Sequence, residues 1–253
     1  MEIFKVMKLL FINPNITDEI TDVMAGEACR SASVGTEVIT AKANFGTLYI
    51  ANRIEAAISG HAILEVLAEN HGKCDAAIIS AFGDPGLYAA KELMDIPVVG
   101  VSEAAFLFAY TQGKRYSIVC LTERLRTWYV ECAVEHGLDG RMASSRALSI
   151  PVKDITRAKQ DLADELIAEC LLAVEKDGAE VIVLGGGPIA GLAHEIAPKI
   201  PVPVIDGISC AVKLAESLVA LDLKSPERGS FARPAAKPSR GLSSALSAMI
   251  SND

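Results

Sequence analysis

The sequence lacks the features that mark several large classes of protein. Its 253 residues include a single Trp, no cluster of basic residues and no apolar run of membrane-spanning length. The formal net charge of −8 therefore indicates solubility, and neither nucleic acid nor a membrane is an expected partner. The opening stretch, Met1 to Leu10, is too short and too charged to be an export signal, which predicts a cytoplasmic protein.

Cysteine pairs and metal-binding spacings are also missing. The six cysteines are scattered without a CxxC pair, which is typical of reduced thiols in a cytoplasm; they are Cys29, Cys74, Cys120, Cys132, Cys170 and Cys210. No spacing among the four histidines suits a metal ion. We therefore expect neither a metal nor another cofactor.

What is present is one unit written twice. An apolar run breaks into a glycine-proline turn at Ile78–Gly86 and again at Val183–Pro188. Each turn leads into an Ala-rich helix and then into a proline-bounded strand, at Ile96–Ser102 and Val202–Ser209. Two such turns, one from each half, would present backbone N–H groups to a small anion-friendly pocket between the halves. Neither turn carries a cysteine.

Apolar strands alternate with amphipathic helices along the chain, which predicts an α/β fold with two parallel-sheet lobes covered on both faces. We expect strands at 8–13, 37–41, 76–80, 98–101, 116–121, 147–150, 181–184 and 204–205, and helices at 18–31, 54–69, 83–93, 103–110, 123–136, 157–176, near 192, and ending at 221. The predicted lobes are 1–110 and 111–205, with the 206–223 helix packing back on the first lobe. Residues 224–253 form a polar tail that is a surface strap or loosely held.

Polar groups stand at the end of nearly every predicted strand, where ligands of open α/β sheets bind. Each alone is explained by a turn or a helix cap, but together they indicate a binding site. They include Asn13, Asn15, Lys42, Ser80, Asp84, Glu103, Cys120, the turn at Gly186 and Gly187, and Asp206–Ser209.

Six segments carry a recognisable pattern: Ile12–Asn15, Phe82–Leu87, Leu184–Gly185, Val202–Ser209, Ala211–Lys213 and Glu216–Leu221. From about Leu9 to Asp222 the chain resembles the aspartate/glutamate/hydantoin racemase superfamily, and most of all its hydantoin and allantoin racemases. The resemblance implies two pseudo-symmetric lobes and a cysteine in each turn, one removing the α-proton and the other returning a proton from the opposite face. Those cysteines would fall on Ala81 and Gly186. Cys120-Leu121 and Leu48–Ala51 also depart from the family pattern.

Without thiols in the turns, preorganised N–H donors and a base that positions water would suffice for hydrolysis. We therefore expect an enzyme that opens a small cyclic amino-acid-derived compound, such as a hydantoin, another cyclic ureide or a thiazoline carboxylate. The candidate catalytic residues are Ser80, Asp84, Glu103 and Lys42. The candidate substrate-binding residues are Asn13, Asn15, Tyr49, Arg53, Ala81, Phe82, Cys120, Gly186, Gly187 and Pro188, with Arg53 gripping a carboxylate.

Simpler interpretations stand beside these roles. Ser80 could only cap its turn, and Arg53 could belong to a solvated helix face. Racemisation by non-cysteine bases, decarboxylation, an inactive enzyme and a small-carboxylate binding protein are the alternative functions. Gly185, Gly187, Ala190 and Asp206 also match a dinucleotide fingerprint formally, although too little chain follows for a complete Rossmann half. We expect a small-molecule substrate and a homo-oligomer.

Overall fold

The first lobe is a parallel sheet with helices on both faces. The computed structural model describes residues 6–148, 159–223 and 225–251. The elements of this lobe are β1 (Met7–Asn13), α1 (Asp18–Ser31), β2 (Thr36–Lys42), α2 (Arg53–Glu69), β3 (Ala76–Ile79), α3 (Leu87–Leu93), β4 (Val98–Gly100) and α4 (Val101–Gln112).

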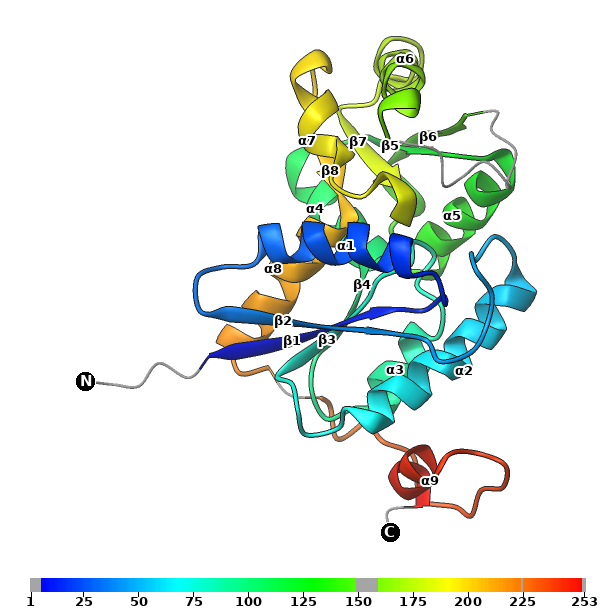
Figure 1. Ribbon diagram of the computed structural model, residues 1–253. Coiled ribbons are helices and arrows are strands. Elements are labelled where there is room, and N and C mark those ends of the chain that lie inside the picture. Colours follow the sequence, from blue (N-terminus) through cyan, green and yellow to red (C-terminus); the bar gives the residue numbers. More distant parts are fainter. Residues whose placement is uncertain (1–5, 149–158, 224, 252–253) are drawn as a thin grey trace.

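The second lobe repeats this pattern. Its elements are β5 (Tyr116–Cys120), α5 (Glu123–Glu135), η1 (Asp139–Arg141), β6 (Met142–Ala147), α6 (Lys159–Asp177), β7 (Val181–Gly185), η3 (Gly187–Ile189), α7 (Leu192–Ile196), η4 (Ala197–Lys199) and β8 (Val204–Asp206). Helices α8 (Gly207–Ala220) and α9 (Ser244–Ser251) follow. Figure 1 shows the second lobe, in green and yellow, above the first, in blue and cyan.

Both sheets have the same strand order. The first runs β2-β1-β3-β4 and the second β6-β5-β7-β8, and every pairing is parallel. The predicted α/β fold with two parallel-sheet lobes is therefore confirmed. In each sheet the order reverses beside the first strand, so the carboxyl ends of β1 and β3, and of β5 and β7, mark the places where a ligand is expected.

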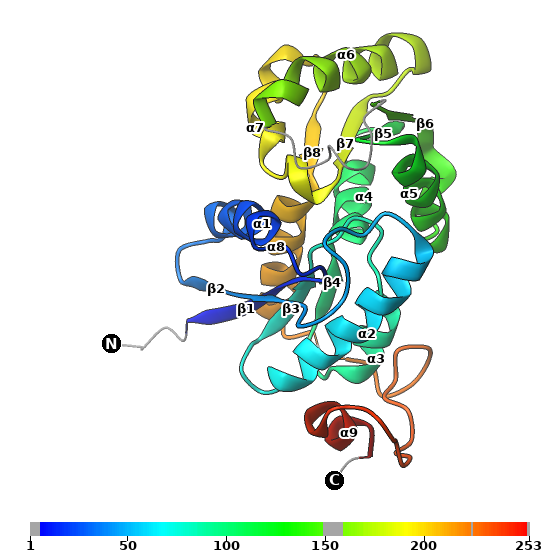
Figure 2. The same ribbon diagram turned by 45° about the vertical axis from the view of Figure 1, so that its right-hand side comes forward.

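The central strands form because they are short, apolar and buried on both faces. Every residue of β3, β5 and β7 is buried. Helix α8 begins where the Asp206 side chain accepts the N–H groups of Ile208 and Ser209, a strong N-terminal cap. It then packs against α1, α4 and β3, so the last helix of the repeat lies on first-lobe elements (Figure 2). The boundaries drawn at residues 110 and 205 remain a prediction.

Two elements differ from expectation. The helix expected from residue 83 begins only at Leu87, because Asp84 and Gly86 take left-handed backbone conformations with φ of 44° and 73°. The strand expected at 147–150 lies at Met142–Ala147, where small and polar side chains give an edge strand a weak apolar pattern. Residues 149 and 150 of that prediction, and 157 and 158 of the predicted 157–176 helix, lie outside the described residues.

The tail contains a helix that its composition did not predict. Helix α9, drawn in red in Figure 1, packs against α2 and buries Leu246 and Met249. Its first turn is held by Glu65, whose carboxylate accepts hydrogen bonds from the backbone N–H and the hydroxyl of Ser243. Among the described residues, no helix is long and apolar enough to cross a membrane.

Candidate functional site

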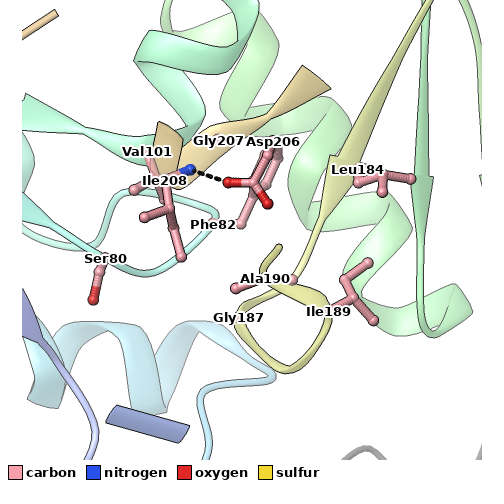
Figure 3. A pocket seen from close by; sticks show the side chains of 11 residues that line it. Ser80, Phe82, Val101, Leu184, Gly187, Ile189, Ala190, Asp206, Gly207 and Ile208 are labelled. Carbon is pink, nitrogen blue, oxygen red and sulfur yellow. Dashed lines mark hydrogen bonds between the residues drawn. The ribbon is translucent and has the colours of Figure 1, made fainter. Parts of the chain in front are cut away.

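The two glycine turns meet at one cavity between the lobes. Figure 3 shows the wall of this cavity, with Ser80 and Phe82 on one side and the turn through Gly187 and Ala190 facing them. The volume open to water inside it is about 20 Å³, room for about one water molecule, so the two turns would have to move apart to admit a ring-sized ligand. Its lining residues are Ser80, Phe82, Val101, Leu184, Gly186, Gly187, Ile189, Ala190, Asp206, Gly207 and Ile208.

The first-lobe turn is held by its own hydrogen bonds and by aromatic packing. The Ser80 hydroxyl, 2% exposed, donates to the Ile12 carbonyl oxygen at 2.8 Å. Its proton is thus engaged, although its oxygen can still accept. Phe82 packs against Phe106 and Tyr129, with ring centroids 5.6 and 4.6 Å away. Because Tyr129 belongs to α5, this contact ties the turn to the second lobe.

The second-lobe turn approaches the first lobe closely through backbone. Gly186 has a φ of +135°, which L-residues rarely adopt. A Cβ at Gly187 would lie 2.7 Å from Sδ of Met24 on α1. Pro188 sits inside the short η3 turn and is not part of the cavity wall. A side chain at Gly187 would therefore force the buried Met24 side chain to move.

Asp206, one of the polar groups at the predicted strand ends, lines the cavity, although the sequence analysis gave it no catalytic or substrate-binding role. One carboxylate oxygen accepts the N–H groups of Ile208 and Ser209, at 2.9 and 3.0 Å, and the other accepts Gly191 N–H at 2.8 Å. Burial raises the pKa of Asp206 above its ordinary value. Its position at the end of β8 was the available signal. A dinucleotide site would need this carboxylate to accept hydrogen bonds from a ribose. Because three backbone N–H groups already occupy it, the dinucleotide interpretation is weakened.

Asn13 and Asn15 are buried and bonded to one another. Asn13 Nδ2 donates to Asn15 Oδ1 at 3.0 Å and to the Thr21 hydroxyl at 2.7 Å, and Asn13 Oδ1 accepts Asn15 N–H. They hold the turn between β1 and α1, and neither lines the cavity.

Three charged candidates lie in ion pairs outside this cavity. Lys42 pairs with Asp18, Glu103 with Lys91, and Arg53 with Glu131 of the second lobe. Asp84 also lies outside the first cavity and lines a second one with Arg53. The structure therefore does not bring these four side chains to the cavity that the two turns form.

Tyr49 and Cys120 lie in the interior near the turns. The Tyr49 hydroxyl shares a hydrogen bond with that of Tyr129, and burial raises the Tyr49 pKa well above its ordinary value. Burial likewise raises the pKa of the Cys120 thiol to about 12. Cys120 Sγ contacts the carbonyl oxygens of Thr122 and Arg146. A thiol in this setting stays protonated and unreactive. Ala81 lies between Ser80 and Phe82 without lining the cavity.

The family is decided by comparison with known proteins. The model of a family described as Asp/Glu/Hydantoin racemase matches residues 9–215. The chain belongs to this family. It is 34% identical to a hydantoin racemase of Paenarthrobacter aurescens over 233 residues, covering 91% of this chain and 99% of the relative.

Solved structures show the same kinship. An allantoin racemase from Klebsiella pneumoniae superposes with a TM-score of 0.90 at 33% identity, covering 95% of this chain and 98% of that one. An arylmalonate decarboxylase superposes with a TM-score of 0.60 at 16% identity, covering 89% of this chain and 97% of that one, and so shares the fold alone.

These relatives correct the expected reaction. The expectation of hydrolytic ring opening is wrong, because the similar proteins that cover nearly the whole chain are hydantoin and allantoin racemases. For decarboxylation, the only support is the fold shared with an arylmalonate decarboxylase. Racemisation, the alternative that the sequence left open, is the better supported reaction.

Proposed function

We propose that this protein racemises a small five-membered cyclic ureide of the hydantoin or allantoin kind. The observation that carries the proposal is the placement of one glycine turn from each lobe on a single cavity. A ring held there would meet a different lobe on each face. This arrangement suits removal of a proton from one face of the ring carbon and return of a proton to the other.

We further propose that no thiol in the turns takes part. Ala81 and Gly186 stand where the family resemblance places cysteines. Among the eleven residues that line the cavity, Ser80 and Asp206 have an exchangeable side-chain proton. Ser80 comes from the first lobe, and Asp206 ends the last strand of the second. Because the Ser80 hydroxyl donates to Ile12 and both oxygens of Asp206 accept backbone N–H groups, we assign each side chain to hold a water that carries the proton, one on each face of the ring.

The chemistry conserves all atoms of the substrate. The C–H bond beside the ring carbonyl breaks, its electron pair moves into the carbonyl as an enolate, and a proton from the other face re-forms the bond. Backbone N–H groups of the turns would stabilise the enolate oxygen; in other enzymes, loss of one such donor costs about 3–4 kcal/mol. The expected cytoplasmic location and self-association remain predictions.

The test follows optical activity and mass together. A single enantiomer of allantoin or of a 5-substituted hydantoin should lose circular dichroism faster than an enzyme-free sample, with no change in mass. In D₂O the product should carry one deuterium on the ring carbon. A gain of one water, or no acceleration across both compound types, would contradict the proposal.

Variants test the assigned side chains. Ser80→Ala and Asp206→Asn should each lower kcat by at least about tenfold, since each alters the group that holds the proton-carrying water. The oxygen of Asn can still accept the two N–H groups that begin α8, but the bond from Gly191 N–H is lost, so far-ultraviolet circular dichroism is used to check that the variant is folded. Unchanged turnover in both variants would remove these residues from the mechanism.

A separate prediction concerns the Cys120 thiol. Cys120→Ser should keep most activity, and iodoacetamide should not inactivate the enzyme, because the thiol is buried and its pKa is raised to about 12. Inactivation that coincides with modification of Cys120 alone would show that a thiol does participate.

A further inference from the structure

A second cavity lies on the other side of the first-lobe turn. It has a volume of about 330 Å³ open to water and lies between α2, the segment from Gly83 to Ala89, and α5 of the second lobe. Arg53 and Trp128 are on its wall. Three potential metal ligands, Asp84, Cys132 and His136, also line it.

The three side chains converge on one point. One ligand atom of each lies within 4.8 Å of the other two. His136 Nε2 is 3.0 Å from Asp84 Oδ2, a hydrogen-bond distance that would widen to only about 3.3 Å if both atoms bound one tetrahedral ion. The side chains of His136 and Asp84 are 6% and 2% exposed, and Cys132 is 2% exposed. Nitrogen, sulfur and oxygen donors are thus gathered away from bulk water.

We propose that Asp84, Cys132 and His136 bind one zinc ion, with a water from the second cavity in the fourth position. Imidazole nitrogen, thiolate sulfur and carboxylate oxygen in a tetrahedral set are typical of zinc and unsuited to magnesium or calcium. On binding, the Cys132 thiol releases its proton to solvent and the sulfur forms the bond to the metal. The ion keeps its charge state, so no oxidant or reductant is needed.

The ligands are already held in place by their neighbours. The Asp84 carboxylate accepts the N–H groups of Ser102 and Glu103 at 3.0 and 2.8 Å. The Tyr88 hydroxyl lies 3.3 Å from the remaining ring nitrogen of His136, Nδ1. Such outer contacts orient metal ligands and fix the imidazole tautomer. Binding would replace the hydrogen bond that Cys132 shares with the Ser102 side chain.

The site would join the lobes. Asp84 follows the turn that carries Ala81 and Phe82, whereas Cys132 lies on α5 and His136 follows its last residue. A bound ion would clamp this turn to the second lobe at the side opposite the proposed substrate cavity. Its role is therefore structural, and the ion takes no part in the proposed proton exchange.

The proposal departs from the sequence expectation of no metal. That expectation considered spacings among the histidines, but Cys132 and His136 are four residues apart and share one helical face. Asp84 is 52 positions from His136 in sequence, so only the folded chain brings it to them.

Cobalt titration of the chelator-treated full chain tests the site. One equivalent of Co²⁺ should bind and give the absorption of a cobalt-thiolate bond, and Zn²⁺ should displace it. The melting temperature should rise with Zn²⁺. Absence of a thiolate band at one equivalent of Co²⁺ in the wild type overturns the proposal by itself.

Variants locate the thiolate. Cys132→Ser should abolish the band, and His136→Gln should weaken binding by at least about a hundredfold, more than loss of an outer contact usually does. Cys74→Ser, which alters a half-buried thiol elsewhere, is the matched control and should bind like the wild type. Retention of the band in Cys132→Ser, or its loss in Cys74→Ser, would show that another site binds the metal.

Discussion

At the scale of single residues, Gly186 tests whether the second-lobe turn belongs to the site. Its φ of +135° is strained for any L-residue, although an added Cβ would make only ordinary contact with Leu121, at 3.6 Å. We expect Gly186→Val to shift the turn, at a cost of about 1–3 kcal/mol, and to lower kcat at least about tenfold. Urea denaturation followed by circular dichroism measures the change in the free energy of unfolding, and the racemisation assay measures kcat. Wild-type turnover in a folded variant would exclude the turn from the site.

A double variant tests the relation to thiol-dependent family members. Ala81→Cys combined with Gly186→Cys places a thiol in each turn. We expect racemisation of a hydantoin to become sensitive to iodoacetamide, because a newly introduced thiol would then share in proton transfer. The wild-type enzyme under the same treatment is the control. Unaltered insensitivity would mean that the new thiols do not reach the substrate.

The structure gives Arg53 a surface ion pair, whereas the sequence analysis expected it to bind a substrate carboxylate. It pairs with Glu131 at the surface, and the two side chains are 65% and 44% exposed. Such exposed pairs contribute about 0–1 kcal/mol to stability. Arg53→Ala should therefore leave KM within about twofold of wild type and change the free energy of unfolding by less than about 1 kcal/mol. A KM raised by one to two powers of ten would restore Arg53 as a substrate ligand.

At the scale of elements, α9 stabilises the first lobe although it lies far from the cavity. Leu246, 1% exposed, belongs to a core cluster with Ile63 and Leu67 of α2. Leu246→Ala should lower the free energy of unfolding by about 2–4 kcal/mol, because it leaves a cavity in packed surroundings. Ala248→Ser, at an exposed position of the same helix, should change it by less than about 0.5 kcal/mol. Urea denaturation measures both, and equal effects would mean that α9 is not packed.

At the scale of the whole molecule, a buried carboxylate joins the lobes. Glu27 on α1 accepts hydrogen bonds from Arg30 and from Ser209 on α8, and lies 3.3 Å from His194 on α7. Burial acts to raise its pKa, but the hydrogen bonds from Arg30 and Ser209 outweigh this and lower the pKa from 4.5 to about 2. The carboxylate is therefore more stable in the folded protein than in the unfolded chain.

The sign of the pH dependence follows from this lowered pKa. The contribution is fully present above about pH 4.5 and is lost as the pH falls toward 2. Glu27→Gln should lower the free energy of unfolding by about 2–3 kcal/mol near neutral pH, and by less at about pH 3. Glu19→Gln, an exposed position on the same helix, is the control. A difference from wild type that is the same at both pH values would show that the charge of Glu27 is not the cause.

The sequence by itself determined the fold class, most elements and the family, because these depend on local patterns. Buried parallel strands are short apolar runs, and segments such as Phe82–Leu87 and Val202–Ser209 carry the family resemblance within a few residues. Where the local pattern was weak, as in the small and polar edge strand β6 or the Ser-rich start of α9, the prediction was displaced or missing.

Only the tertiary structure decided which strand ends share a cavity. Ser80 and Asp84 are four residues apart, yet the first lines the cavity between the turns and the second faces Cys132 and His136. The backbone turns between them, with positive φ angles of 106° at Gly83 and 44° at Asp84. The packing of α5 against this turn then sets which neighbours each side chain contacts. Asp206 likewise reaches the cavity because α8 folds back on the first lobe. Side-chain direction after a strand depends on turn geometry and lobe packing, which composition and spacing do not encode.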